Sequence, residues 1–379
     1  MKKNSTKLLL IAMALIISLL AGCNETSKPS SSNNTGNKKD TSINFKYAKG
    51  LQVKYIGNSC KLIIDSAGKK FLLVPNGKSA PKGYGDVKIV NTPVKKVAAF
   101  STTYVSALRS IGELNSVAAV TTEKDKWYID EIKKGINKGS ITYVGKQDSP
   151  NYEQIKAIHP DIAILHTGSA NQEKQIAKLE SLGITCISYN EHMQDNPLAK
   201  IEAIKVLAAF FNKDEVAENN LNKIEANIKA VSEKIKTSKK PKVAYAYILK
   251  GLVYVPNDGS YVAKMIDLAG GDYIFNNIGK NEGAYSKISV EEFYQKAKTA
   301  DVLIYDNTSD LSVKNLNNLV TNNSILKDMS PIANDKVWGI NKTYWQDTDK
   351  MDTIIKDMSA AFYPKKYSNY KPTYYYKLK

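Results

Sequence analysis

Arginine and histidine are scarce in this sequence, and their scarcity excludes several classes of protein. Of the 54 basic residues only Arg109 is an arginine, although the formal net charge is +17. Proteins that read nucleic acid depend on arginine for bidentate contacts, so we expect no nucleic-acid partner. The lysine excess indicates a lysine-covered surface, or attraction to an anionic ligand or cell envelope. The three histidines, His159, His166 and His192, form no H-x-x-x-H pattern, which argues against a histidine-rich metal site.

Catalytic and nucleotide-binding motifs are also missing. The sequence contains no Walker A loop, zinc-finger spacing, G-x-G-x-x-G fingerprint, Ser-His-Asp triad or Cys-His pair at a recognisable spacing. Ser66 and Lys69 have the S-x-x-K spacing of a serine acyl-enzyme, but the S-D-N and K-T-G partners are absent and the pair falls on a predicted turn. We therefore expect no enzymatic activity. Cys60 and Cys186 lie in apolar strand-like runs, and both a disulfide and two buried free thiols remain open.

The uncharged run from Leu8 to Leu20 is thirteen residues long, shorter than the roughly 20 residues that a membrane-spanning helix needs. It follows a start with three lysines, which is the pattern of a signal peptide. The next segment, LAGC, resembles the lipobox of bacterial lipoproteins. The resemblance implies cleavage before Cys23 and a diacylglycerol anchor on its thiol. We expect a lipoprotein signal peptide over residues 1–22 and a lipidated flexible tether, rich in Ser, Asn and Lys, over residues 23–44.

Short apolar strands alternate with helices in the first half of the chain. LQVKYIG, KLIID and KFLLV predict strands, and DSAGKK predicts a hairpin turn between the last two. A helix capped by Ser101 or Thr102 follows the next strand. The further strands are predicted at 94–100, 116–121, 141–145, 161–167 and 184–190. This alternation is typical of parallel α/β structure.

Two helices separate the first half from the second. Residues 197–211 and 214–237 keep apolar side chains on one face, and the second helix would be about 36 Å long, enough to join two lobes. Beyond it, strands are predicted at 242–248, 252–256 and 336–340, helices at 260–271 and 349–364, and a helix feeding a buried strand at 289–308. The expected fold is two α/β lobes joined by a single long helix. The predicted parts are an N-terminal lobe over 45–211, an interlobe helix over 212–238, and a C-terminal lobe with a basic Tyr/Lys tail over 239–379.

A weak internal repeat supports two related lobes. EQIKAIHPDIAIL (153–165) and EEFYQKAKTADVLI (291–304) both run from an acidic residue through an amphipathic helix to an aspartate and a buried strand. In the first copy, Pro150 is predicted in the first helical turn, with Ser149 or Asn151 as the cap. His159 and Asp161 mark a turn, about 18 Å of strand away from His166, so the two histidines cannot share a metal.

The carboxyl ends of parallel strands are where open α/β sheets bind ligands. Aromatic side chains with a few polar groups gather at these ends, which favours a large, flat or apolar ligand. The candidate ligand-binding residues are Ser101, Thr102, Thr103, Tyr104, Trp127, Tyr128, Lys146, His166, His192, Tyr247, Tyr285, Tyr305, Tyr344, Trp345 and Gln346. As an alternative, His166 and His192 with Glu191 or Asp347 would bind a bare divalent metal.

The order and spacing of several segments resemble those of a known family, the substrate-binding lipoproteins of ABC importers for ferric siderophores, haem and cobalamin. The resemblance covers about residues 45–363. GKKFLLVPNG, Trp127-Tyr128 and TYWQ are closest to a clostridial-type branch. The segments that carry the resemblance are VKKVAAFSTTYVSALRSIG, YVGKQDSPNYEQIKAIHPDIAIL, LESLGITCISYN, the long helix, KMIDLAGGDYIF, SVEEFYQKAKTADVLIYDNT and VWGINKTYWQ.

The resemblance implies a ligand cleft between two α/β lobes that one rigid helix joins. It also implies that one glutamate of each lobe, Glu153 and Glu291, meets arginines of the permease. Members that bind anionic siderophores or haem often line the cleft with arginines. This chain has only Arg109, inside a predicted helix, so the resemblance leaves the identity of the ligand open.

We therefore expect a monomeric binding protein, lipid-anchored on the extracytoplasmic face of a Gram-positive cell membrane. It would deliver a siderophore, haem, cobalamin or similar metal chelate to an ABC permease and its ATPase. No covalent cofactor is expected besides the diacylglycerol on Cys23, and no metal bound by the protein alone; iron in the ligand is one option. The alternatives are a zinc or manganese receptor of the same fold, and a surface lipoprotein enzyme or adhesin.

Overall fold

The structure is a computed structural model that describes residues 41–279 and 283–379. The predicted signal peptide, Cys23 and most of the predicted tether lie outside the described residues. The end of that tether is part of the fold, because Ile43 N donates to Val53 O at 2.8 Å and Ser42 forms a β-bridge with Lys54. The prediction of a flexible tether is therefore wrong for residues 41–44. None of the described helices has both the length and the apolar character needed to span a membrane.

A small sheet precedes the first lobe in the chain. Strands β1 (Gln52–Ile56), β2 (Cys60–Ile64) and β3 (Lys70–Pro75) are antiparallel, and β4 (Lys88–Thr92) joins β3 in parallel. The predicted hairpin between β2 and β3 is confirmed: Asp65 Oδ1 accepts hydrogen bonds from Ala67 N and Lys69 N at 2.9 Å each. One face of this sheet packs into the main core through Val53 and Phe71.

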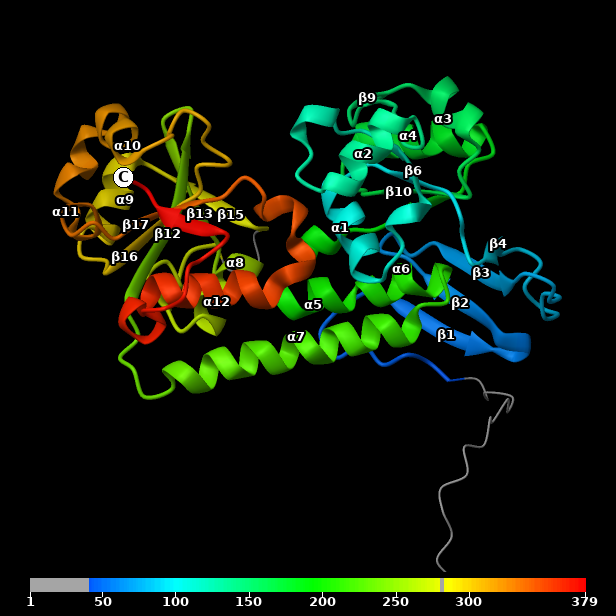
Figure 1. The fold of residues 1–379 in the computed structure, drawn as a ribbon, viewed down its shortest axis with the longest axis horizontal. Helices are drawn as coiled ribbons and strands as arrows, with labels where there is room; N and C mark the ends of the chain where they lie inside the picture. The colour runs from blue at the N-terminus through cyan, green and yellow to red at the C-terminus, as the bar shows by residue number, and fades with distance from the viewer. Residues whose placement is uncertain (1–40, 280–282) are drawn as a thin grey trace, which may run out of the picture. The chain divides into compact units, whose positions relative to one another are not determined.

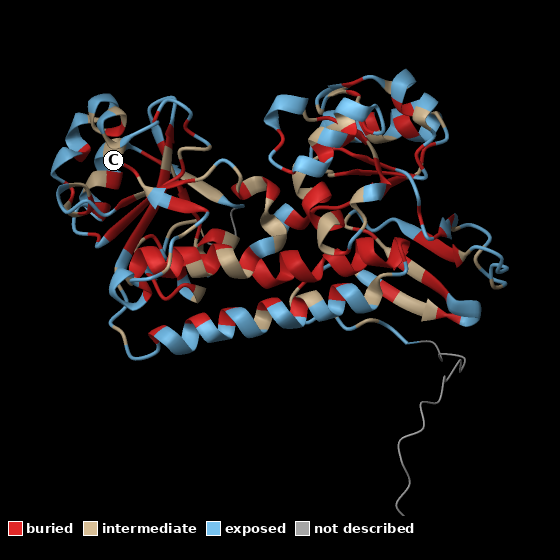
Figure 2. Cartoon of the chain, in the orientation of Figure 1, coloured by how far each residue is buried: buried red, intermediate tan, exposed pale blue. Residues whose placement is uncertain are grey.

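The N-terminal lobe is built on a parallel sheet with the strand order β11-β10-β5-β6-β7. These strands are β5 (Val97–Ala99), β6 (Val117–Val120), β7 (Thr142–Tyr143), β10 (Ile162–Leu165) and β11 (Cys186–Ser188). Each lies inside one of the five predicted strand segments. The associated helices are α1 (Thr102–Ser110), α2 (Asp130–Lys138), α3 (Tyr152–Ile158) and α4 (Ala170–Ser181). Strands β5, β10 and β11 are buried along their whole length, as expected for a parallel sheet covered on both faces (Figure 2).

A helical base connects this lobe to the next. The predicted helix over 197–211 is broken at Ala203 into α5 (Pro197–Glu202) and α6 (Ile204–Phe210). The long helix α7 (Asp214–Ile235) follows and is about 33 Å long. It runs beneath both lobes in Figure 1. Its apolar positions, from Leu221 to Ile235, are buried at the predicted helical spacing while the other face is exposed (Figure 2).

The C-terminal lobe has a mixed sheet with the order β15-β13-β12-β16-β17-β18, and β14 also pairs with β12. Parallel pairing joins β12, β14, β16 and β17, whereas β13, β15 and β18 pair antiparallel. The strands are β12 (Lys242–Leu249), β13 (Leu252–Pro256), β14 (Asp272–Tyr273), β15 (Tyr285–Ile288), β16 (Val302–Tyr305), β17 (Val337–Ile340) and β18 (Tyr375–Lys377). The helices are α8 (Tyr261–Leu268), α9 (Val290–Ala297), α10 (Leu316–Asn322), α11 (Ser330–Ala333) and α12 (Met351–Phe362).

The C-terminal end of the chain differs from the predicted basic tail. Tyr374, Tyr375 and Leu378 are buried, and β18 pairs with β17. Buried Asp357 of α12 fixes this segment, because its Oδ2 accepts hydrogen bonds from Thr373 N and Tyr374 N at 2.6 Å each. The alternating tyrosines and lysines therefore read as an edge strand of the sheet.

The predicted repeat corresponds to two equivalent helix–strand units. Helix α3 leads into β10, and helix α9 leads into β16, and both strands pair in parallel with a strand on either side. The helix start in the first unit differs by a residue or two from the prediction. Asn151 is the cap, accepting a hydrogen bond from Gln154 N at 3.0 Å, while Pro150 still belongs to strand β9 (Ser149–Pro150). His159 ends α3 with a φ of 51°, in the predicted turn.

Candidate ligand-binding site

The first half of the candidate site lies at the carboxyl ends of β5 and β10. Ser101 caps α1 by accepting a hydrogen bond from Thr103 N at 3.3 Å. This cap directs Tyr104 into the interior, where its hydroxyl lies 3.2 Å from His166 Nδ1. Gln147 Nε2 lies 3.3 Å from the same nitrogen, and Gln172 Nε2 contacts His166 Nε2. The sequence analysis missed both glutamines, although each lies close to the end of a predicted strand.

The two histidines of this half meet edge to face. Their ring centroids are 5.3 Å apart, and Glu191 Oε2 lies 3.7 Å from His192 Nδ1. Burial lowers the pKa of both His166 and His192 from the ordinary value of 6.5. Both rings are therefore neutral near pH 7, and each offers one nitrogen donor and one acceptor to a ligand.

The second half of the candidate site is a group of tyrosines on the sheet of the C-terminal lobe. Tyr247 stacks on Tyr254 with centroids 4.7 Å apart, and Tyr285 meets Tyr247 edge to face at 5.5 Å. All three side chains are half-buried. Burial raises the pKa of Tyr247 and Tyr285, so their hydroxyl groups stay protonated and able to donate hydrogen bonds. Tyr254 was missed, although it pairs with Tyr247 across the predicted hairpin.

The loop of residues 341–350 brings Tyr344 and Trp345 to the same lobe. Tyr344 is buried and its hydroxyl lies 2.6 Å from the hydroxyl of Tyr261. Trp345 is half-buried, packs edge to face on Tyr344 at 5.0 Å, and donates from Nε1 to Thr308 Oγ1 at 2.9 Å. One partner fixes each ring, so the indole is held in one orientation.

The same loop touches the N-terminal lobe. Gln346 Oε1 accepts a hydrogen bond from Tyr128 N at 2.7 Å, and its Nε2 donates to Lys126 O at 2.7 Å. The ring of Tyr128 lies between Lys133 and Lys342, with each ammonium less than 6 Å from its centroid, at 5.8 and 5.6 Å. Gln346 is itself buried, so its amide serves this contact between the lobes.

Arg109 is fully engaged in the interlobe contact. Its guanidinium donates to Asp349 Oδ2 at 3.0 Å, to Asp347 Oδ1 at 2.6 Å and to Gln346 O at 3.1 Å. Ser106, one turn earlier on α1, also donates to Asp349, at 2.8 Å. The only arginine of the chain therefore binds carboxylates of the protein itself, and Asp347 is not available for the divalent-metal alternative.

Two predicted ligand-binding residues belong to the core. Trp127 is 1% exposed and its Nε1 donates to Thr122 O at 3.0 Å. Tyr305 is 1% exposed, donates to Asp310 and accepts a hydrogen bond from Ile248 N at 3.2 Å. Their large aromatic surfaces are used for packing, which a single sequence does not distinguish from ligand contact, and we leave them out of the site. Lys146 is exposed on the short strand β8 (Gly145–Lys146).

The described residues contain no group of three or more His, Cys, Asp and Glu side chains placed to hold a metal ion. Cys60 and Cys186 are buried free thiols, which answers the question of their pairing. Glu153 and Glu291 are exposed in the first turns of α3 and α9. Both helices lie toward the upper side of the molecule in Figure 1, away from α7.

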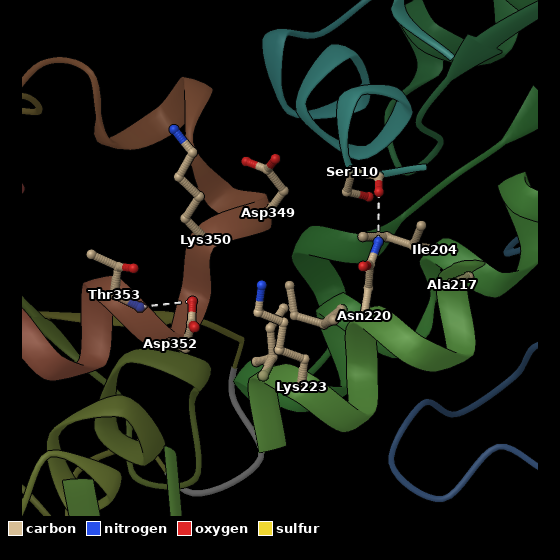
Figure 3. Close-up of a pocket in the computed structure, with 11 residues that line it drawn as sticks. Ser110, Ile204, Ala217, Asn220, Lys223, Asp349, Lys350, Asp352 and Thr353 are labelled. Carbon is tan, nitrogen blue, oxygen red and sulfur yellow. Dashed lines mark hydrogen bonds between the residues drawn. The ribbon is translucent and has the colours of Figure 1, made fainter. Parts of the chain in front are cut away.

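A cavity of about 310 Å³ lies at the junction of the lobes, between α1, the helical base and the start of α12 (Figure 3). Asn220 spans part of it by donating to Ser110 O at 2.5 Å. Lys223 and Asp349 also line it. None of the predicted ligand-binding residues does, so this cavity is separate from the candidate site.

Known proteins resemble this chain in both sequence and structure. The family model described as periplasmic binding protein matches residues 97–344. The uncharacterized lipoprotein MJ0878 of Methanocaldococcus jannaschii is 30% identical, over 97% of this chain and 95% of the relative. The ferric-anguibactin-binding protein FatB of Vibrio anguillarum is 24% identical, over 72% of this chain and 82% of its own length.

A solved structure has the same fold. The periplasmic haem-binding protein RhuT of Roseiflexus aligns with a TM-score of 0.56 and 18% identity, over 72% of this chain and 99% of RhuT. The two-lobed α/β architecture predicted from the sequence is thereby confirmed. The family match over most of both lobes, together with the relative of 30% identity, shows that the chain belongs to the periplasmic binding protein family.

Proposed function

We propose that this protein is the solute-binding lipoprotein of an ABC importer and that it captures a metal–organic ligand, an iron chelate, haem or a cobalamin, between its lobes. The observation that carries the proposal is the pairing of two half-sites at carboxyl ends of strands, imidazoles on one lobe and tyrosines on the other. Aromatic faces with a few neutral nitrogen and hydroxyl groups suit a large, partly apolar chelate.

The printed names of the relatives agree with this ligand class. FatB is described as binding ferric anguibactin, and RhuT as binding haem. The absence of a free arginine beside the half-sites favours a ligand without a dense cluster of anionic groups, since Arg109 is bound to Asp347 and Asp349.

Anchoring and delivery complete the proposal. Cys23 would carry a diacylglycerol, in line with the lipoprotein name of MJ0878, and hold the protein on the extracytoplasmic face of the membrane. Glu153 and Glu291 would dock, one from each lobe, onto arginines of the permease, which works with its ATPase. Two carboxylates on separate lobes would fix the orientation of docking as well as attract the partner. The protein would act as a monomer and catalyse no reaction.

The test is the absorption spectrum and metal content of the protein purified from its native host. A Soret band, a corrin band or a ferric charge-transfer band is expected and would name the ligand class. Stoichiometric zinc or manganese without a chromophore would overturn the proposal and favour the divalent-metal receptor. A protein with no metal and no chromophore that also binds no ferric chelate, haemin or cobalamin when these are added would overturn it as well.

A further inference from the structure

Glu191 is a buried carboxylate at the same sheet edge as the first half-site. It opens the 3-10 helix η4 (Glu191–Met193), just after β11 ends, and only 9% of its side chain is exposed. Around it lie the two histidines and two buried tyrosines, Tyr104 and Tyr189, which meet edge to face at 5.6 Å. The negative charge of Glu191 contributes to the raised pKa of both tyrosines, after burial.

This carboxylate lacks the partners that buried carboxylates normally have. Its Oε2 is fully buried without a hydrogen-bond partner, and no residue in the described part of the chain donates a hydrogen bond to Glu191. By comparison, buried Glu202 accepts hydrogen bonds from the backbone N–H groups of Lys46, Tyr47 and Ala48, at 2.6 to 2.8 Å. A buried charge without a donor is unfavourable, so Glu191 is built to receive a donor from outside the chain.

The neighbouring cationic groups do not neutralise it. His192 and His166 are held neutral by burial near pH 7. Lys200 of α5 is 8% exposed, but its ammonium lies 4.2 Å from the ring centroid of Tyr261 and forms no ion pair with any described carboxylate. A negative charge bordered by aromatic rings is a good environment for a cation.

We infer that Glu191 recognises a positively charged, N–H-donating arm of the ligand, so that the transported ligand is a metal chelate bearing a protonated amine. This inference rests on the proposed function and narrows its ligand class. The imidazoles and tyrosines would contact the body of the chelate, while the amine arm replaces the missing hydrogen-bond donor at Glu191. An N–H donor on a charged arm forms the stronger, charge-assisted type of hydrogen bond.

The test compares two ferric chelates that differ in one charge. Ferric desferrioxamine B carries a protonated amine arm, and its N-acetylated counterpart carries a neutral one. Tryptophan-fluorescence titration of the mature protein should give a Kd about tenfold lower for the amine form. In Glu191→Gln the two Kd values should agree within about twofold, while Glu191→Asp, which keeps the charge, should retain part of the preference. Glu153→Gln, an exposed glutamate of the same lobe, is the matched control and should leave the preference intact.

Every other pattern contradicts the inference. Equal affinity of the wild-type protein for the two chelates, or an amine preference that survives in Glu191→Gln, would remove the role of Glu191. Binding of only anionic or neutral ligands, tested with haemin, ferric citrate and cobalamin, would show that the site does not select a cation, yet would leave the proposed function standing. If none of these chelates binds, the proposed function itself fails, and the inference fails with it.

Discussion

At the scale of single residues, burial decides the protonation state of the groups in the candidate site. His166 and His192 have lowered pKa values and the surrounding tyrosines raised ones, each mainly because of burial. The site is thus lined by neutral donors and acceptors near pH 7, with Glu191 as its negative group. Neutral imidazoles and phenols lose less solvation than charged groups when a large ligand covers them.

The lowered histidine pKa values make stability depend on pH. Between the folded pKa and the ordinary value of 6.5, the unfolded chain binds more protons than the folded protein. Stability is therefore fully present above 6.5 and decreases as the pH falls below it. Thermal unfolding should show a larger drop in Tm from about pH 7.5 to about pH 5.5 for the wild-type protein than for the double variant His166→Gln, His192→Gln. Equal drops in the two proteins would contradict the predicted direction of the histidine pKa shifts.

Trp345 is predicted to contact the ligand. Its indole is fixed by Tyr344 and Thr308, so binding needs little further ordering of this side chain. Trp345→Ala should raise the Kd of the co-purifying ligand about tenfold or more and remove ligand-induced tryptophan quenching. Trp338→Phe is the control, because Trp338 lies under Lys377 on β17 rather than among the half-site residues. An unchanged Kd in Trp345→Ala would place Trp345 outside the site.

At the scale of elements, the loop of residues 341–350 is the connection that matters most. It leaves β17 of the C-terminal lobe, carries Trp345, and then binds α1 of the N-terminal lobe through Arg109 and Ser106. Any change in the position of this loop therefore affects both the indole and the contact between the lobes.

Arg109 should contribute strongly to stability for this reason. Arg109→Gln leaves half-buried Asp347 and largely buried Asp349 without their guanidinium, and should lower the free energy of unfolding by about 3 kcal/mol in urea titration. The control is Lys240→Gln, which removes an exposed ion pair with Asp267 and should cost less than about 1 kcal/mol. A loss of similar size in both variants would show that the arginine contact is no stronger than a surface pair.

At the scale of the whole molecule, the helical base and the two lobes separate ligand capture from docking. Glu153 and Glu291 begin equivalent helices on different lobes, and both are exposed (Figure 1). Neither contacts a half-site residue through a printed hydrogen bond or ion pair, so charge reversal there should leave the binding site unchanged.

The double variant Glu153→Arg, Glu291→Arg should abolish ligand uptake by cells while the Kd of the purified protein stays within about twofold of the wild-type value. The physical reason is that the reversed charges would repel the arginines of the permease. Glu215→Arg with Glu233→Arg, two exposed positions on α7, is the matched control and should leave uptake intact. Lost ligand affinity in the first variant would place the two glutamates in binding rather than docking.

The sequence predicted the fold well because its signals are local. Strand length, helix spacing and the caps at Ser101 and Asn151 are readable from neighbouring residues, and the buried stripe of α7 follows helical periodicity. The break at Ala203 and the edge strand β18 were not readable, because each depends on contacts with distant residues, such as the hydrogen bonds from Thr373 and Tyr374 to Asp357.

The sequence by itself determined the two-lobed α/β architecture and the strand ends at which a ligand would bind, since hydrophobic patterning is a property of the chain. Only the tertiary structure decided which aromatic residues stay available. It placed Trp127 and Tyr305 in the core, committed Arg109 to Asp347 and Asp349, and left Glu191 buried without a donor. Burial and hydrogen-bond partners arise from residues far apart in the chain, so they follow from the packing of the folded protein and not from the order of its residues.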